Sequence, residues 1–180
     1  MHSPLGELLH SWHDLYILLG TASATLVGFM FVAASIGAHI FTESNRPGTG
    51  AFISPTVVHF SSALFLCVAG TIPVHSAFTL GALVGLIGIV GGGYSAKIVV
   101  QLFIRRQFTV DVVDRLFYAF VPLAGYLGVL AAAATLFMHA EWGLIVLAAA
   151  LLTLLLAGIR NAWDMMIWIM IKIPVDKPPA

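Results

Sequence analysis

The sequence AFTLGALVGLIGIVGGGYSAKIVVQLFI, residues 77–104, decides the fold class of this chain. It holds no charged residue before Lys97, and it is longer than the ~20 apolar residues that a helix needs to cross about 30 Å of hydrocarbon. Comparable apolar segments occur at residues 15–41, 51–71, 116–138 and 143–163. Because lipid offers no hydrogen-bond partner, each segment must be helical. The pattern predicts an all-α integral membrane protein, a five-span helical bundle in which residues 1–180 form a single membrane domain.

Composition excludes the main soluble classes. Apolar residues make up 60% of the chain and charged residues only 9%, which is incompatible with an ordinary water-soluble domain. The net charge is zero, so no nucleic-acid partner is indicated. The single cysteine, Cys67, lies within an apolar segment and is interpreted as a small buried residue.

Basic residues are distributed asymmetrically once the five segments are threaded back and forth. One face receives all eight Lys and Arg residues: Arg46, Lys97, Arg105, Arg106, Arg115, Arg160, Lys172 and Lys177. Positively charged loops stay in the cytoplasm. The sequence therefore predicts that the N-terminus lies outside and the C-terminus lies in the cytoplasm.

The N-terminal segment is amphipathic. Leu5, Leu8, Trp12 and Tyr16 recur at helical spacing, with polar residues between them. This predicts a short interfacial amphipathic helix that runs into the first span, which we expect to be retained because no basic region precedes it.

Proline and glycine suggest where the other helices begin and bend. We expect a loop over residues 42–50 and a second helix that begins at Ser54-Pro55. Pro122 should kink the fourth span.

Small residues mark two helix faces. In each span a spacing of three or four residues places the small residues on one helix face. They are Gly20, Ala24 and Gly28 in the first span, and Gly81, Gly85, Gly88 and Gly92 in the third. Such faces allow helices in lipid to approach closely. The third-span stripe fits packing within one copy, a subunit interface or the lining of a pore.

The last segment allows two interpretations. Either the helix ends near Trp163 and an amphipathic stretch follows on the inner surface, or one tilted helix continues to Lys172. In the second case Arg160 and Asp164 form an ion pair at depth, which is a functional candidate. We favour the first interpretation, because Arg160 can reach the interface easily near a helix end.

Histidines gather on the face without Lys or Arg. His10 and His13 are three residues apart, and other loops bring further candidates. The predicted metal ligands, for Zn or Cu, are His10, His13, Asp14, His75, His139 and Glu141. Two alternatives remain: a proton-responsive cluster, and a solvated surface without a ligand.

His59 lies within the second span, where a polar group is costly. It can form a hydrogen bond to Ser61, Ser62 or a backbone carbonyl, transfer protons, or ligate haem. Haem ligation by two histidines would need His39 as its second ligand, and His39 lies too near the inner end of the first span.

Two stretches at the ends of the chain resemble a known group. GTASATLVGFMFVA, residues 20–33, resembles the opening helix of a group of small bacterial inner-membrane proteins, and RNAWD, residues 160–164, resembles its closing segment. No activity is established for that group. The resemblance implies a multi-pass protein of a bacterial inner membrane and assigns no catalytic residues.

The expected function is that of an accessory or self-associating subunit, with the lipid bilayer, further copies or a larger membrane complex as partners. The outer face would offer a histidine–carboxylate site for a metal or for protons. An oligomeric ion channel lined by the third helix and a metal or haem redox subunit are the alternatives. No P-loop or nucleophile motif indicates an enzyme.

Overall fold

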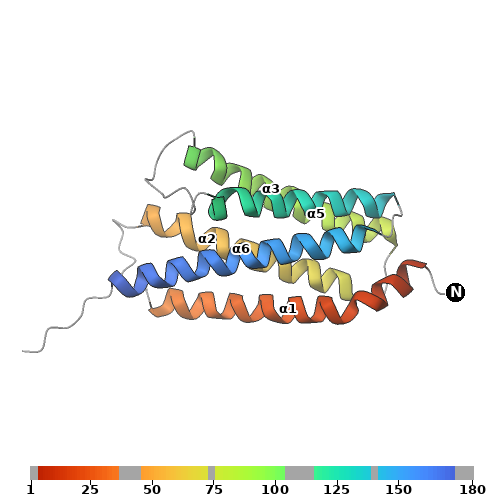
Figure 1. Cartoon of the computed structure of the whole chain (residues 1–180), viewed down its shortest axis with the longest axis horizontal. Coiled ribbons are helices and arrows are strands. Elements are labelled where there is room, and N and C mark those ends of the chain that lie inside the picture. The colour runs from red at the N-terminus through yellow and green to blue at the C-terminus, as the bar shows by residue number, and fades with distance from the viewer. Residues whose placement is uncertain (1–3, 37–45, 73–75, 104–115, 139–141, 173–180) are drawn as a thin grey trace, which may run out of the picture.

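The chain folds into a bundle of long helices. The computed structural model describes residues 4–36, 46–72, 76–103, 116–138 and 142–172, and these contain no strand. In chain order they form α1 (Pro4–Ile36), α2 (Arg46–Thr71), α3 (Ala77–Phe103), a π-helical turn η3 (Leu116–Phe120), α5 (Val121–Phe137) and α6 (Trp142–Lys172). The five long helices follow the long axis, and successive helices run in opposite directions (Figure 1). The all-helical prediction is confirmed.

Four helices contain stretches that are long and apolar enough to cross a membrane. These stretches are Glu7–Ile36, Ala77–Gln101, Phe117–Phe137 and Trp142–Ile167, whereas the apolar part of α2, Pro55–Thr71, is shorter. Large apolar side chains also cover the outside of the bundle, and Phe31 and Met138 are 76% and 77% exposed. A surface of this kind suits hydrocarbon rather than water.

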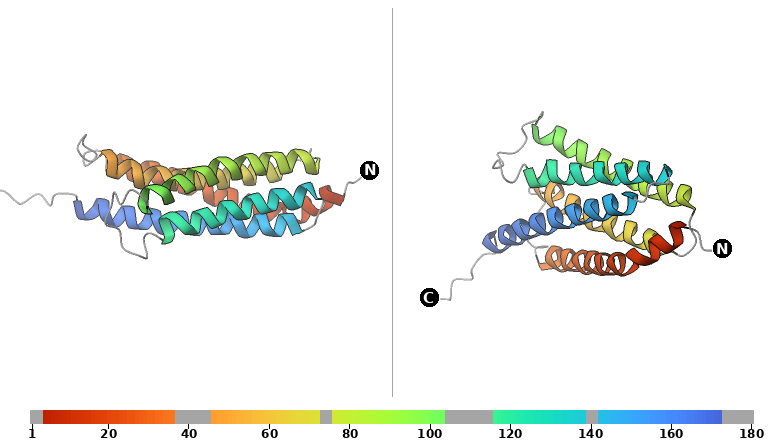
Figure 2. Two further views of the ribbon diagram at one scale, coloured as in Figure 1. Left: turned by 90° about the horizontal axis from the view of Figure 1, so that it is seen from above. Right: turned by 45° about the vertical axis from the view of Figure 1, so that its right-hand side comes forward.

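The helices pack in a fixed order. α5 lies between α3 and α6, while α1 packs mainly against α2, and α2 also contacts α6 and α3 (Figure 2). Tyr16, Phe60 and Tyr126 are among the largest fully buried side chains. Leu80 of α3 and Leu147 of α6 are also fully buried, so every long helix contributes to the interior.

The third-span glycines face α5 of the same chain. A Cβ atom added to each of these glycines would lie 2.7–3.6 Å from a side-chain atom of α5. The facing pairs are Gly81 and Phe137, Gly85 and Ala133, Gly88 and Leu130, and Gly92 and Tyr126. The four pairs keep one antiparallel register. The stripe thus brings α3 and α5 close together within one copy.

The small residues of α1 behave differently. A Cβ on Gly20 would lie 3.2 Å from Cβ of Cys67, so this residue packs against α2. Ala24 and Gly28 are exposed, and nothing lies within 4 Å of a Cβ built on Gly28. Only one residue of this stripe packs inside the bundle.

Two helix starts differ from the sequence predictions. α2 begins at Arg46 rather than at Ser54-Pro55. Pro47 is compatible with this start because it lies in the first turn, where a backbone N–H would have no partner within the helix. Pro55 lies inside α2. Pro122 lies in the first turn of α5, directly after the π-helical turn η3.

The last helix follows the interpretation that we did not favour. α6 continues without interruption to Lys172. Its polar residues do not end it, because Arg160 pairs with Asp164 and Asn161 bonds to η3. The ion pair and the amide bond hold these side chains within the bundle, although Oδ1 of Asn161 has no hydrogen-bond partner among the described residues.

Candidate functional site

A buried hydrogen-bonded chain joins α2 to α5. His59 is fully buried, and its Nδ1 lies 3.2 Å from the hydroxyl oxygen of Tyr126. The Tyr126 hydroxyl donates in turn to Oγ of Ser62, one turn further along α2, at 3.0 Å. Sequence analysis identified His59 and Ser62 but not Tyr126, which is also fully buried.

This geometry fixes the tautomer of the imidazole. A phenol carries one hydrogen, and Tyr126 uses it in the bond to Ser62. Its oxygen must therefore accept from His59, so Nδ1 carries the proton and Nε2 carries a free lone pair. No partner for Nε2 exists among the described residues. An unsatisfied buried acceptor costs about 1–3 kcal/mol, so this nitrogen is a candidate binding atom.

The tight packing around Tyr126 holds the chain in place. A Cβ on Gly91 of α3 would lie only 2.0 Å from Cε1 of Tyr126, so the phenol ring occupies the space that the glycine leaves. The ring is also tilted against the His59 imidazole, at a centroid distance of 5.6 Å. Both observations make the Tyr126 hydroxyl a rigid link rather than a mobile one.

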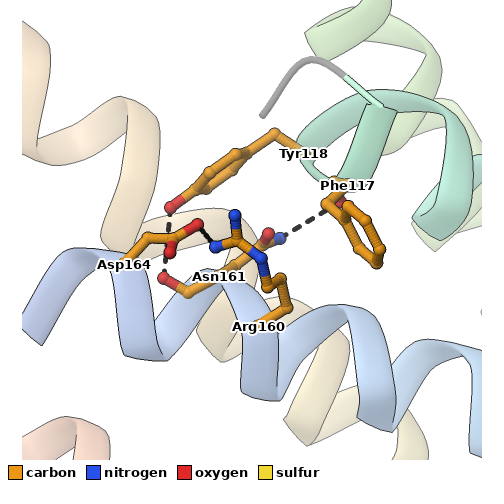
Figure 3. A network of polar contacts seen from close by, with 5 residues as sticks. All are labelled: Phe117, Tyr118, Arg160, Asn161 and Asp164. Carbon is orange, nitrogen blue, oxygen red and sulfur yellow. Dashed lines mark hydrogen bonds and ion pairs between the residues drawn. The ribbon is translucent and has the colours of Figure 1, made fainter. Parts of the chain in front are cut away.

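A second polar network ties α6 to η3, as Figure 3 shows. Arg160 forms an ion pair with Asp164, and its guanidinium lies 5.6 Å from the ring centroid of Phe117. The side-chain amide of Asn161 donates to the backbone oxygen of Phe117, and Tyr118 donates to the backbone oxygen of Asn161. The predicted pair at depth is therefore part of a network that fixes the start of the fourth span.

Buried polar atoms without a hydrogen-bond partner also occur on α3 and α6. Besides His59 Nε2, Oγ of Ser95 and Oδ1 of Asn161 are buried and without a hydrogen-bond partner in the described part of the chain. The ring of Phe60 packs against Gly158, which sets the level of α2 relative to α6. His59 and Asn161 lie on these two packed helices, one residue before Phe60 and three residues after Gly158.

Haem ligation, which the sequence already disfavours, gains no support from this arrangement. His59 is enclosed on every side, so a porphyrin would have to separate α2 from its neighbours. His39 lies outside the described residues.

The outer histidines are only partly described. His10, His13 and Asp14 are exposed on α1, while His75, His139 and Glu141 lie outside the described residues. Within the described ranges, no three His, Cys, Asp or Glu side chains are grouped closely enough to hold a metal ion. The predicted metal site remains a prediction.

A binding measurement tests that prediction. If His13 is a ligand, His13→Ala should lower the affinity for Zn²⁺ by at least the ~10–100-fold that follows loss of an outer-shell partner. Binding should also weaken as pH falls, because only neutral imidazole ligates a metal. Isothermal titration of wild type and variant in detergent measures both effects. Equal stoichiometry and affinity in the two proteins would show that these histidines are solvated surface residues that do not bind the metal.

Sequence reasoning missed two parts of the site. Nothing in the sequence indicated that Tyr126 would meet His59, because the pairing depends on which helices are neighbours. The π-helical turn was also missed, although Pro122 gave a local signal of irregularity. π-turns are frequent at functional sites.

Comparison with protein families, curated proteins and solved structures gives no match for this chain.

Proposed function

We propose that this chain is a multi-pass subunit of a bacterial inner membrane that associates with a second copy of itself through α1. The proposal includes an outer-face histidine–carboxylate site for a metal or for protons. The exposed His10, His13 and Asp14 near the N-terminal end of α1 support that part. The bacterial membrane rests on the sequence resemblance.

The exposed face of α1 carries the proposal. Exposed residues recur on it at alternating four- and three-residue spacing, and all but Val32 are small or hydroxyl-bearing: Thr21, Thr25, Gly28, Val32 and Ser35. This repeat averages 3.5 residues, which is the spacing of helices that pack along a left-handed seam. We call these five residues the α1 seam. Small residues at such a seam let two backbones approach in lipid.

The hydroxyl groups of the seam are compatible with burial in an interface. Thr21, Thr25 and Ser35 each donate to a carbonyl one turn earlier in α1, at 2.8–2.9 Å. Covering them with a second helix therefore leaves no donor unsatisfied. A second copy is the occupant that we infer, because a twofold interface is formed by the same surface on both subunits.

Leucine substitutions test the seam. Gly28→Leu should lower the oligomeric state in mild detergent or nanodiscs, because the added side chain keeps the two backbones apart. Gly93→Leu is the matched control, since Gly93 is also an exposed helical glycine with nothing within 4 Å of its Cβ position, on a different helix. Mass photometry or cross-linking gives the readout. An unchanged oligomer in Gly28→Leu, or a monomeric wild type, would contradict the proposal.

The proposed topology has α2 as a fifth crossing and the N-terminus outside. The alternating helix directions support an odd number of crossings, because α1 begins and α6 ends at opposite ends of the bundle (Figure 1). The distribution of Lys and Arg along the sequence supports the outside N-terminus. Cysteines at His10 and Gly48, each in a Cys67→Ser background, should differ in labelling by an impermeant maleimide on intact cells. The first should react and the second should not. The reverse pattern would invert the topology.

The channel alternative loses its main argument. Its pore was expected along the third-span glycines, and these lie against α5 of the same chain. The redox alternative rests on the outer histidines and on His59, and the zinc titration above and an absorption spectrum address it.

A further inference from the structure

We infer that His59, Tyr126 and Ser62 form a proton relay inside the bundle, with Nε2 of His59 as its accepting end. In one transfer, a proton binds Nε2 while the Nδ1 proton moves to the oxygen of Tyr126. The phenolic proton moves to Oγ of Ser62, and the Ser62 hydroxyl releases its own proton. One proton enters, one leaves, and every group ends neutral. The inference is independent of self-association.

The direction of the hydrogen bonds carries the argument. Nδ1 of His59 donates to Tyr126, and Tyr126 donates to Ser62, so the two bonds point the same way along the chain. A head-to-tail row of donors can pass a proton without moving a heavy atom. A network that only stabilises packing has no need of a free acceptor at its first member, yet His59 Nε2 is buried and unpartnered among the described residues.

The proton enters the relay from the side of α6, which packs against α2. Asn161 Oδ1 on α6 is a second buried acceptor without a hydrogen-bond partner among the described residues, and Asp164 follows Asn161 by less than one turn. Asp164 keeps 27% of its side chain exposed, so the carboxylate connects the buried region with the surroundings. The relay then leads away from that end, because Ser62 lies further along α2 than His59 and is only partly buried.

Few titratable groups surround the relay in the described residues. On α3, Tyr94 interacts electrostatically with Tyr126, and Lys97 is exposed. On α6, Arg160 and Asp164 neutralise each other, and Lys172 is the last residue of the helix. On α1 the buried titratable residue is Tyr16, which packs against Gly70 of α2, more than two turns from His59. Since no unpaired charge sits beside the imidazole, the transferred proton passes through without being trapped.

Proton flux in proteoliposomes tests the relay. The full-length protein is reconstituted with valinomycin and potassium to hold the membrane potential, and an internal pH dye follows the decay of an imposed pH gradient. Wild type should dissipate the gradient faster than protein-free vesicles. Tyr126→Phe removes the relay hydroxyl and keeps the ring. It should lower the rate of gradient decay at least about tenfold, which is less than the full contribution that a positioned proton-transfer group can make.

Two further variants keep the test decisive. Tyr118→Phe removes a buried phenol that donates to the backbone of α6 and lies outside the relay, and it should stay within about twofold of wild type. Ser62→Ala removes the last hydroxyl with little change in packing, and it replaces Tyr126→Phe if that variant does not fold. Wild-type flux equal to that of empty vesicles overturns the relay. So does undiminished flux in a folded Tyr126→Phe or Ser62→Ala protein.

Discussion

Gly91→Ala should lower the thermal stability of the bundle markedly, although it adds a single methyl group. The new Cβ would lie 2.0 Å from Cε1 and 2.4 Å from Cζ of Tyr126. The ring cannot move aside easily, because Tyr126 is fully buried and its hydroxyl bonds both His59 and Ser62. Overpacking typically costs about 1–3 kcal/mol and occasionally more. We expect a value at the upper end.

Gly93→Ala is the control for this prediction. Nothing lies within 4 Å of its Cβ position, and alanine favours a helix over glycine by roughly 0.8–1.0 kcal/mol, so stability should stay equal or rise. Thermal unfolding in detergent, followed by circular dichroism, compares the two variants with wild type. Equal melting temperatures for both variants would show that Tyr126 is less tightly held than the contacts indicate.

Asp164→Leu should be the second severe change. It removes the partner of Arg160 and leaves a cation within the helix bundle. Removal of one member of a buried pair costs about 3–5 kcal/mol. Because the two side chains retain 35% and 27% exposure, we expect a loss near the lower end of that range. Unfolding in a denaturant series measures it.

The double variant Arg160→Leu/Asp164→Leu gives the decisive comparison. When both charges are absent, no group is left uncompensated, so most of the lost stability should return. The loss of the contact between Arg160 and Phe117 should leave a residual deficit. A double variant as unstable as Asp164→Leu alone would mean that the carboxylate stabilises the protein through something other than Arg160.

Hydropathy predicted the helices because a span has to be apolar over its whole length. It did not predict their ends, because Pro47 and Pro55 both occur within α2, whereas the sequence alone favours a loop around Pro47 and a helix start at Pro55. The end of α6 was misjudged for a related reason. Arg160 and Asp164 suggest an interface when read singly, whereas the structure neutralises them as a pair and continues the helix.

The periodicity of the third-span glycines identified a face but not its neighbour. Which helix fills that face depends on the order in which five similar helices pack, and hydropathy does not encode this order. The same limit applies to the relay. His59 was recognisable as a costly buried group, but the partner that orients its imidazole comes from a helix more than 60 residues away in sequence.

The constant register between α3 and α5 restricts how the gene can change in length. One residue inserted into either helix would rotate everything beyond it by about 100° and replace each following glycine at the contact with a side chain. An insertion between residues 104 and 115 would leave all four pairs opposite one another. Length variation among natural relatives should therefore concentrate in that connection and avoid both helices.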